Sequence, residues 1–251
     1  MPLEINIMEE AGVRTLHFGS SWIQGAMRIA RPWNLELEYT KEMMASLLLR
    51  EESRFPRKVL LIGLGAASLT KFLYRNYPLA KLTVVEIEPA VVAAAKQFFK
   101  LPEDPLRLNM VIGDGVEYVM SSDKNWDLIL VDGFDADARA GALDTLPFYQ
   151  AVRARLSSNG IMSVNLLGRS KGYKASVERI HAAFDGRALA FPSCDSGNTI
   201  AFAAAGDDIS IALDDLKEQA LELKESTSLN LLPTLTRLEQ AQSCTGGILE
   251  L

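Results

Sequence analysis

Residues 84–89 read VVEIEP, an apolar run that ends on Glu86 and leads directly into Pro89. Proline is favoured at the first turn of a helix, where its missing N–H would have no partner anyway. The stretch therefore predicts a strand over 80–88 and a helix over 89–99. A carboxylate at the end of a buried strand is unusual, and the ends of the neighbouring strands indicate what it is for.

The same alternation of strand and helix patterns runs through the middle of the chain. Alternating strand and helix signals are typical of a mostly parallel, doubly wound α/β sheet of the Rossmann type. The further strands are expected at 57–65, 106–115, 125–135, 161–168, 187–193 and 198–206, and the further helices at 35–53, 67–78, 116–122, 145–160 and 172–184.

The two ends of the chain depart from this alternation. Residues 14–19 and 21–30 read as short strands separated by a Gly-Ser turn, and helical patterns return at 210–224 and 231–242. The C-terminal helices are expected to pack on the sheet or on a partner chain. We therefore expect an N-terminal β-strand region over 1–38, a Rossmann-like nucleoside-binding domain over 39–206 and a C-terminal helical appendage over 207–251.

Composition excludes several classes of protein. The chain has 251 residues, 48% of them apolar, with no run of about 18 apolar residues that would predict a membrane-spanning helix. Charges near the start occupy the place of a signal peptide's apolar core, so a cytoplasmic protein without a membrane partner is expected. The net charge of −6 argues against a nucleic acid partner. Two cysteines and two histidines argue against a disulfide framework and against a metal site.

Carboxylates follow three successive strands of the predicted sheet. In open α/β sheets, ligands bind beyond the carboxyl ends of the strands. Gly63 and Gly65 end the first strand, and Glu86, Asp114 and Asp132 end the next three. Asp114 could instead only cap the helix after it, because acids are favoured near helix N-termini. The repetition nevertheless predicts a ligand site at this edge.

The charges around the glycine turn indicate which ligand fits. Glu86 lies 23 residues after Gly63, about where an acid binds the ribose hydroxyls of a nucleotide. Asp114 and Asp132 would repel a pyrophosphate, and residues 63–70 contain no Lys or Arg to offset them. A cationic nucleoside of the S-adenosylmethionine type fits better than a dinucleotide.

Several motifs in one order suggest a family. They are WIQGAM (22–27), VLLIGLGAA (59–67), VVEIEP (84–89), GDG (113–115), WDLILVDGFD (126–135) and SGNTIAFA (196–203). In their order and spacing the chain resembles the spermidine synthase (polyamine aminopropyltransferase) family, as a divergent bacterial-type member.

This resemblance implies an activity and a set of residue roles. The activity is transfer of an aminopropyl group from decarboxylated S-adenosylmethionine to a polyamine such as putrescine, in a homodimer and without a metal ion. On the nucleoside side, the resemblance implies that Gln24 and the turn formed by Gly63 and Gly65 contact the nucleoside, that Glu86 binds the ribose, and that Asp114, beside Gly115, binds the adenine. On the amine side, it implies that Asp132 and Asp135 bind the amine and act in catalysis. Tyr39 would lie in the amine pocket, with Phe134 as a further pocket residue.

Departures from the family pattern leave alternatives open. Ala66 stands where the family's glycine loop carries an Asp that binds the donor's ammonium, and the segment after Asp132 reads Gly-Phe-Asp-Ala. One alternative is a methyltransferase that uses S-adenosylmethionine itself, although Leu61 stands where such enzymes typically carry an acid. The other is a non-catalytic nucleoside- or polyamine-binding relative.

Overall fold

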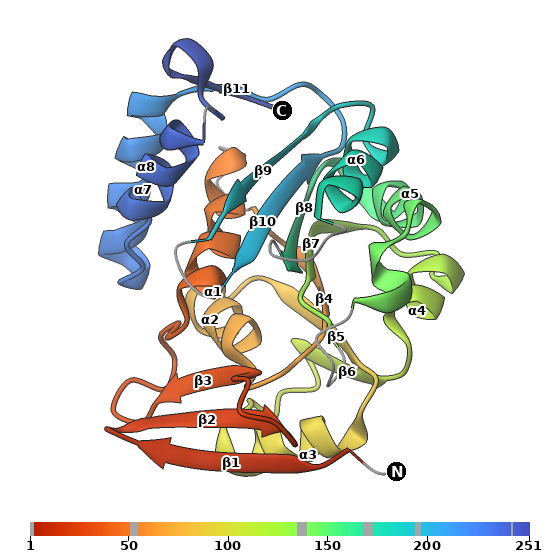
Figure 1. Ribbon diagram of the computed structural model, residues 1–251, viewed down its shortest axis with the longest axis vertical. Helices are drawn as coiled ribbons and strands as arrows, with labels where there is room; N and C mark the ends of the chain where they lie inside the picture. The colour runs from red at the N-terminus through yellow and green to blue at the C-terminus, as the bar shows by residue number, and fades with distance from the viewer. Residues whose placement is uncertain (1–2, 51–54, 135–139, 168–172, 194–196, 242) are drawn as a thin grey trace.

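The computed structural model describes residues 3–50, 55–134, 140–167, 173–193, 197–241 and 243–251. Its centre is a seven-stranded sheet in the order β6-β5-β4-β7-β8-β10-β9 (Figure 1). Strands β4 to β8 run parallel, and β10 is antiparallel to both β8 and β9. The predicted fold class is confirmed. The strands are β4 (Lys58–Ile62), β5 (Lys81–Glu86), β6 (Leu108–Ile112), β7 (Trp126–Val131), β8 (Leu156–Leu167), β9 (Ala188–Pro192) and β10 (Asn198–Ala204).

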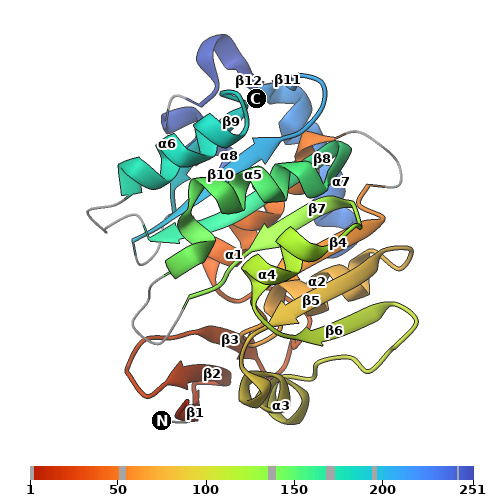
Figure 2. The ribbon, with the colours of Figure 1, turned by 90° about the vertical axis from the view of Figure 1, so that its right-hand side faces the viewer.

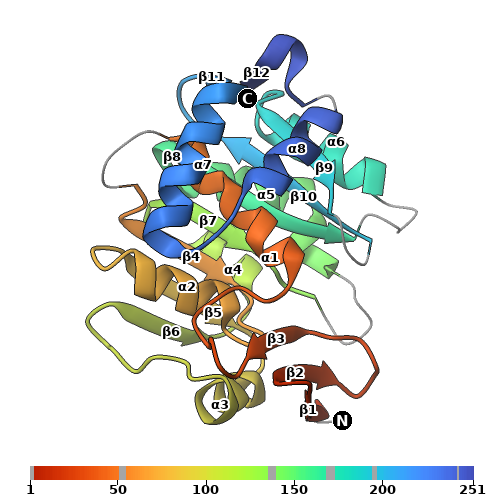
Figure 3. The same ribbon diagram turned by 90° about the vertical axis from the view of Figure 1, so that its left-hand side faces the viewer.

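Helices cover both faces of this sheet. Successive side chains of a strand point to opposite faces, so Val59 and Leu61 pack into one apolar cluster while Leu60 and Ile62 pack into another. Figure 2 shows α4 (Gly115–Ser121), α5 (Leu146–Arg155) and α6 (Tyr173–Ala183) over one face. Figure 3 shows the other face, under α1 (Glu38–Met43), α2 (Ser68–Asn76), α7 (Leu213–Thr227) and α8 (Leu232–Gln240). Helix α3 (Pro89–Phe98) also buries Val91 and Ala95 in the cluster of this second face.

The N-terminal strands form a separate antiparallel sheet of β1 (Ile5–Glu10), β2 (Val13–Phe18) and β3 (Gly25–Arg28). Leu16 and Met27 of this sheet pack with Ala66 of the glycine turn and Phe99 at the end of α3. The Arg14 guanidinium also donates to the Phe98 carbonyl at 2.5 Å. These contacts place the small sheet against the glycine turn, below the main sheet in Figure 1.

The helix predicted to run to Gly160 ends instead at Arg155. Trp126 pairs with Leu156, and Leu128 pairs with Ile161, so the intervening residues bulge out of the β7–β8 ladder. Ser157 Oγ donates to Asp127 Oδ1 at 3.0 Å, which holds the bulge on the strand. The polar run that resembled a helix end is thus the irregular start of β8.

Two other predicted helices are shorter than the sequence pattern suggested. The helix expected over 35–53 is α1 followed by a 3-10 helix, η1 (Met44–Leu49). The helix expected to begin at residue 210 begins at Leu213, because β11 (Ser210–Ala212) pairs with β12 (Ile248–Glu250). This short ladder closes the C-terminal segment on itself.

The C-terminal segment packs on the main sheet, which was the first of the two arrangements predicted for it. Leu216, Leu235 and Leu238 lie in the same apolar cluster as the sheet's residues. Arg237 Nη2 lies 2.5 Å from Oε1 of Glu42, whose side chain is fully buried in α1. The domain boundaries themselves stay a prediction.

We expect Arg237→Met to lower the free energy of unfolding by about 2 kcal/mol. Removing one partner of a fully buried ion pair costs about 3–5 kcal/mol, and Arg237 is partly exposed, so the expected loss is smaller. Chemical denaturation would measure it. Lys217→Met, which removes an exposed pair with Asp214 on α7, is the matched control and should change stability little. Equal effects of the two variants would contradict a structural role for the Arg237–Glu42 pair.

Candidate active site

The carboxyl ends of the central strands meet in one row. Ile62 pairs with Val85 on one side and with Val131 on the other, so the residues that follow them lie at the same edge. Those residues are Gly63, Glu86 and Asp132. The Gly113 N–H donates to the Glu86 carbonyl at 3.0 Å, which adds the start of α4 to the row. The structure therefore brings the backbones of the predicted strand-end residues to one edge.

The glycine turn needs glycine for two reasons. Gly63 has φ of +95°, and a Cβ there would lie 2.1 Å from the Asp132 carbonyl oxygen. Gly65 has φ of +50°, and a Cβ there would lie 3.0 Å from the Gln24 carbonyl oxygen. Since other residues rarely adopt these conformations, the turn can approach both Asp132 and Gln24 only as glycine.

Glu86 is a buried carboxylate that organises the turn. Its Oε2 accepts the Leu64 N–H at 2.9 Å, and its Oε1 accepts the Glu88 N–H at 3.0 Å. Burial raises the pKa of Glu86, and these two backbone hydrogen bonds act in the opposite direction. Each carboxylate oxygen can accept more than one hydrogen bond, so both can still receive a hydroxyl donor.

Asp114 caps α4, as the simpler interpretation of its position predicted. Its Oδ1 accepts the N–H groups of Val116 at 2.7 Å and of Glu117 at 3.0 Å. Both bonds use the same oxygen, so the cap leaves Oδ2 for another donor. Next to it, a Cβ on Gly115 would lie 2.4 Å from Ile62 Cγ2, which explains why α4 begins with glycine.

Asp132 is held by side chains from two other elements. Its Oδ2 accepts the Tyr39 hydroxyl of α1 at 3.1 Å, and its Oδ1 accepts the Asn165 amide of β8 at 2.9 Å. Burial raises the pKa of Asp132, and the two hydrogen bonds oppose that rise. The Asn165 carbonyl oxygen is itself buried without a hydrogen-bond partner among the described residues. The resulting site offers a carboxylate and a free amide acceptor side by side.

The remaining predicted residues differ in what the structure says of them. Asp135 lies outside the described residues, whereas Phe134 is half-exposed directly after Gly133. Ala66 is buried, and a Cβ on Gly25 would lie 2.6 Å from the Ala66 Cβ. The Ala66 side chain therefore packs toward β3.

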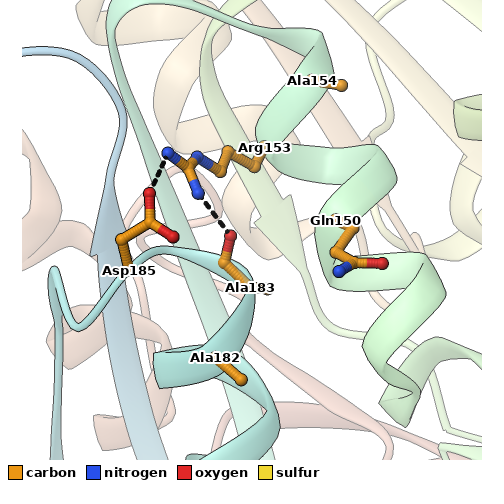
Figure 4. A pocket seen from close by; sticks show the side chains of 6 residues that line it. All are labelled: Gln150, Arg153, Ala154, Ala182, Ala183 and Asp185. Atoms are coloured by element: carbon orange, nitrogen blue, oxygen red, sulfur yellow. Dashed lines mark hydrogen bonds and ion pairs between the residues drawn. The ribbon is translucent and has the colours of Figure 1, made fainter.

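Two surface cavities lie elsewhere on the molecule. One is formed by the C-terminal ends of α5 and α6 around the Arg153–Asp185 pair, and its lining residues are labelled in Figure 4. In this fold those helix ends adjoin the starts of the strands, the edge opposite the acids. The other lies between residues 28–41, Phe72 and the α7–α8 connection. Neither includes the strand-end carboxylates.

Residues 37–181 match the family described as "Spermine/spermidine synthase domain", which covers more than half of the chain. The chain belongs to this family. A relative from Chromobacterium violaceum, named polyamine aminopropyltransferase, is 34% identical over 244 residues, which are 97% of this chain and 92% of the relative. The predicted family membership is confirmed.

Solved structures agree with the spermidine synthase fold. A spermidine synthase in complex with the transition state analogue AdoDATO has a TM-score of 0.65 and 20% identity, covering 95% of this chain and 88% of that one. Human methyltransferase-like protein 13 in complex with SAH has a TM-score of 0.68 and 25% identity, covering 77% of this chain and 93% of that one.

Three residues of this spermidine synthase family member escaped the sequence interpretation. Asn165 follows Val164, which pairs with Val131, so aligning the ends of β7 and β8 would have placed it beside Asp132. Ile87 follows β5 and Ile112 ends β6, yet their side chains are 59% and 50% exposed, respectively. Large apolar side chains left exposed next to Glu86 and Asp114 are candidates for contact with a flat, apolar ring.

No group of three or more His, Cys, Asp or Glu residues in the described part of the chain could hold a metal ion. No helix in the same part combines the length and the apolar character needed to cross a membrane.

Proposed function

We propose that this chain is an aminopropyltransferase that moves an aminopropyl group from decarboxylated S-adenosylmethionine to a polyamine such as putrescine. One observation carries the proposal beyond family membership. Asp132, a carboxylate with a raised pKa, is held by Tyr39 and Asn165 directly beside the glycine turn. A proton acceptor at that place is what a displacement by an amine requires.

In the proposed reaction, the amine nitrogen attacks the carbon next to the donor's sulfonium. The carbon–sulfur bond breaks, its electron pair stays on sulfur, and methylthioadenosine leaves without needing a proton. The amine must lose a proton instead. Freeing an amine with an ordinary pKa of about 10.4 at neutral pH costs roughly 4–5 kcal/mol. The raised pKa of Asp132 makes it a better acceptor for that proton than an exposed Asp would be.

The geometry suggests a division of roles around the reacting atoms. Tyr39 and Asn165 would fix the Asp132 carboxylate, and the Asn165 carbonyl oxygen would accept an N–H of the amine. On the nucleoside side, we propose that Glu86 accepts the ribose hydroxyls and that Asp114 Oδ2 accepts the adenine amino group, with the Gly115 backbone beside it. Gln24 would make a further nucleoside contact, and Ile87 and Ile112 would flank the adenine ring. Phe134 and Asp135 would lie near the amine.

The co-substrate is of the S-adenosylmethionine type, as the family indicates. Orientation of the two reactants against each other would supply much of the remaining rate enhancement. The decarboxylated form is the finer proposal, because the strand-end acids favour a cation over a carboxylate. We further propose a homodimer in the cytoplasm that needs no metal ion and has no nucleic acid or membrane partner.

A second candidate function follows from Ala66. Its side chain packs against Gly25, so the glycine turn offers no carboxylate to a cationic donor tail. Intact S-adenosylmethionine, whose tail carries a carboxylate of its own, would lose less from that absence. A methyltransferase is therefore the alternative, and the fold shared with human methyltransferase-like protein 13 is compatible with it.

The test is a turnover assay with the donors in parallel. We expect the purified protein to release methylthioadenosine from decarboxylated S-adenosylmethionine only when putrescine or another diamine is present. Thermal stabilisation, which grows with the ratio of ligand concentration to Kd, should be larger with methylthioadenosine than with S-adenosylhomocysteine. The reverse preference would favour the methyltransferase. Stabilisation without turnover of any donor would favour a non-catalytic nucleoside-binding protein, and no stabilisation by any of these nucleosides would exclude both enzyme functions.

A further inference from the structure

The segment that follows the undescribed residues after Phe134 presents two opposite faces. Leu143 lies in the 3-10 helix η2 (Gly141–Asp144), and its Cδ1 would be 2.6 Å from a Cβ on Gly133. Its Cδ2 would be 3.5 Å from a Cβ on Gly115. Leu143 is half-exposed and lies between the ends of β7 and β6, next to the residues proposed to bind the nucleoside.

Asp144 engages the opposite side of the same segment. Its Oδ1 accepts the Tyr149 hydroxyl of α5 at 3.0 Å. Its Oδ2 accepts Ser176 Oγ at 2.7 Å and Arg179 Nη2 at 2.6 Å, both from α6. The carboxylate thus joins η2 to two helices through three hydrogen bonds, and the one from Arg179 is also an ion pair. Hydrogen bonds to an ionised carboxylate are about twice as strong as neutral ones.

We propose that Asp144 is a positioning residue for the nucleoside site: anchored by Arg179 and Ser176, it fixes Leu143 as an apolar wall against Gly133 and Gly115. This inference rests on the proposed function, because it takes the carboxyl edge of the central strands to be the nucleoside site. Leu143 and Asp144 are neighbours in sequence on a single 3-10 turn. An anchor on one therefore determines where the other points.

The fit of Leu143 is close on one side. The Leu143 side chain fills the space over Gly133, where an added Cβ would meet its Cδ1 at 2.6 Å, and it shares the space over Gly115 with Ile62. A wall that depends on a close fit loses its effect when it can move. Loss of the Asp144 anchor is therefore expected to lower nucleoside affinity.

The experiment compares Asp144→Asn, Arg179→Met and Leu143→Ala with the wild-type protein. Calorimetry gives the Kd for methylthioadenosine, and steady-state assays give kcat and the KM of each substrate. We expect each variant to weaken methylthioadenosine and raise the donor KM about tenfold, as expected for loss of an apolar contact. The amine KM, and kcat at saturating donor, should stay within about twofold of wild type.

A double-mutant cycle separates positioning from general stability. If Asp144 acts through Leu143, Asp144→Asn combined with Leu143→Ala should weaken binding no more than Leu143→Ala alone. Arg153→Met is the matched control, because Arg153 joins the same two helices at their far ends through Ala183 and Asp185 (Figure 4). It should leave the Kd unchanged.

Three results would overturn the inference: unchanged Kd in Asp144→Asn, additive effects in the cycle, or an equal loss in Arg153→Met. Each of them leaves the proposed function intact, because the wild-type protein would still bind and turn over its donor. A wild-type protein that binds no methylthioadenosine would overturn both. If Asp144→Asn does not fold, the comparison of Arg179→Met with Leu143→Ala decides the same question.

Discussion

Asp132→Asn is expected to lower kcat/KM for the amine by about 10²–10⁴-fold, the usual contribution of a positioned general base. The amide has the shape of the carboxylate and can keep contacts with Tyr39 and Asn165, but it cannot accept the proton that the amine must lose. The Kd for methylthioadenosine should stay close to the wild-type value, because that product lacks the aliphatic amine that Asp132 is proposed to bind. Rapid-mixing or steady-state assays at varied amine concentration would measure the loss.

The pH dependence of kcat/KM provides a second test of the catalytic role of Asp132. Burial raises the pKa of Asp132, so its deprotonated form is gained as the pH rises through that elevated value. The acidic limb of kcat/KM should therefore lie at higher pH than an ordinary Asp would produce, and Asp132→Asn should remove it. Asp123→Asn, an exposed change just before the same strand, is the matched control. Wild-type turnover in Asp132→Asn would refute the catalytic assignment.

Lys71→Met is expected to stabilise the protein at neutral pH. Lys71 lies in α2 and is only 2% exposed, and no hydrogen bond or ion pair engages its ammonium among the described residues. Burial, and then the neighbouring Lys100, lowers the pKa of Lys71 from 10.5 to about 7. Each unit of such a shift corresponds to about 1.4 kcal/mol, so replacing the amine with an apolar side chain should gain a few kcal/mol.

The sign of the pH dependence follows from the same shift. Because the folded pKa lies below the unfolded one, the unfolded state binds more protons between about pH 7 and 10.5. Stability should therefore rise with pH above 7, by at most about 1.4 kcal/mol per unit, and the full penalty should persist below 7. Urea unfolding between pH 6 and 9 would show this rise in the wild type and its absence in Lys71→Met.

A neighbouring lysine provides the control for this second prediction. Lys100 is exposed and acts on Lys71 only through its charge, so Lys100→Met should give a smaller gain in stability and a wild-type-like pH dependence. If Lys71→Met were instead destabilising, or if the rise with pH survived in it, a buried neutral amine at this position would be refuted.

The sequence predicted the alternation of strands and helices well, because apolar periodicity reports local burial directly. It also predicted which residues end the strands, since a strand-end acid is visible one strand at a time. It could not reveal Asn165 as a partner of Asp132, because that contact depends on the register between β7 and β8. The end of α5 was misplaced for a related reason: the bulge at Ser157 is stabilised by Asp127 of a neighbouring strand, not by local sequence.

Side-chain direction was the other limit. Ala66 was compared with a ligand-binding position because of its place in the glycine turn, yet its side chain packs against β3. Asp114 could be predicted either as a cap or as a ligand contact, and the structure shows that one oxygen makes the cap while the other is left for a donor. Such choices depend on backbone geometry that spacing in the sequence does not encode.

The contact between Gly25 and Ala66 also constrains how this lineage can change. A carboxylate at position 66 would need more room than the Ala66 side chain has beside Leu16, Met27 and Phe99. Variants at positions 25 and 66 should therefore be interdependent, with a larger side chain at 66 accepted best together with compensating changes in β3. Donor preference at such a site would depend on the N-terminal sheet as well as on the glycine turn.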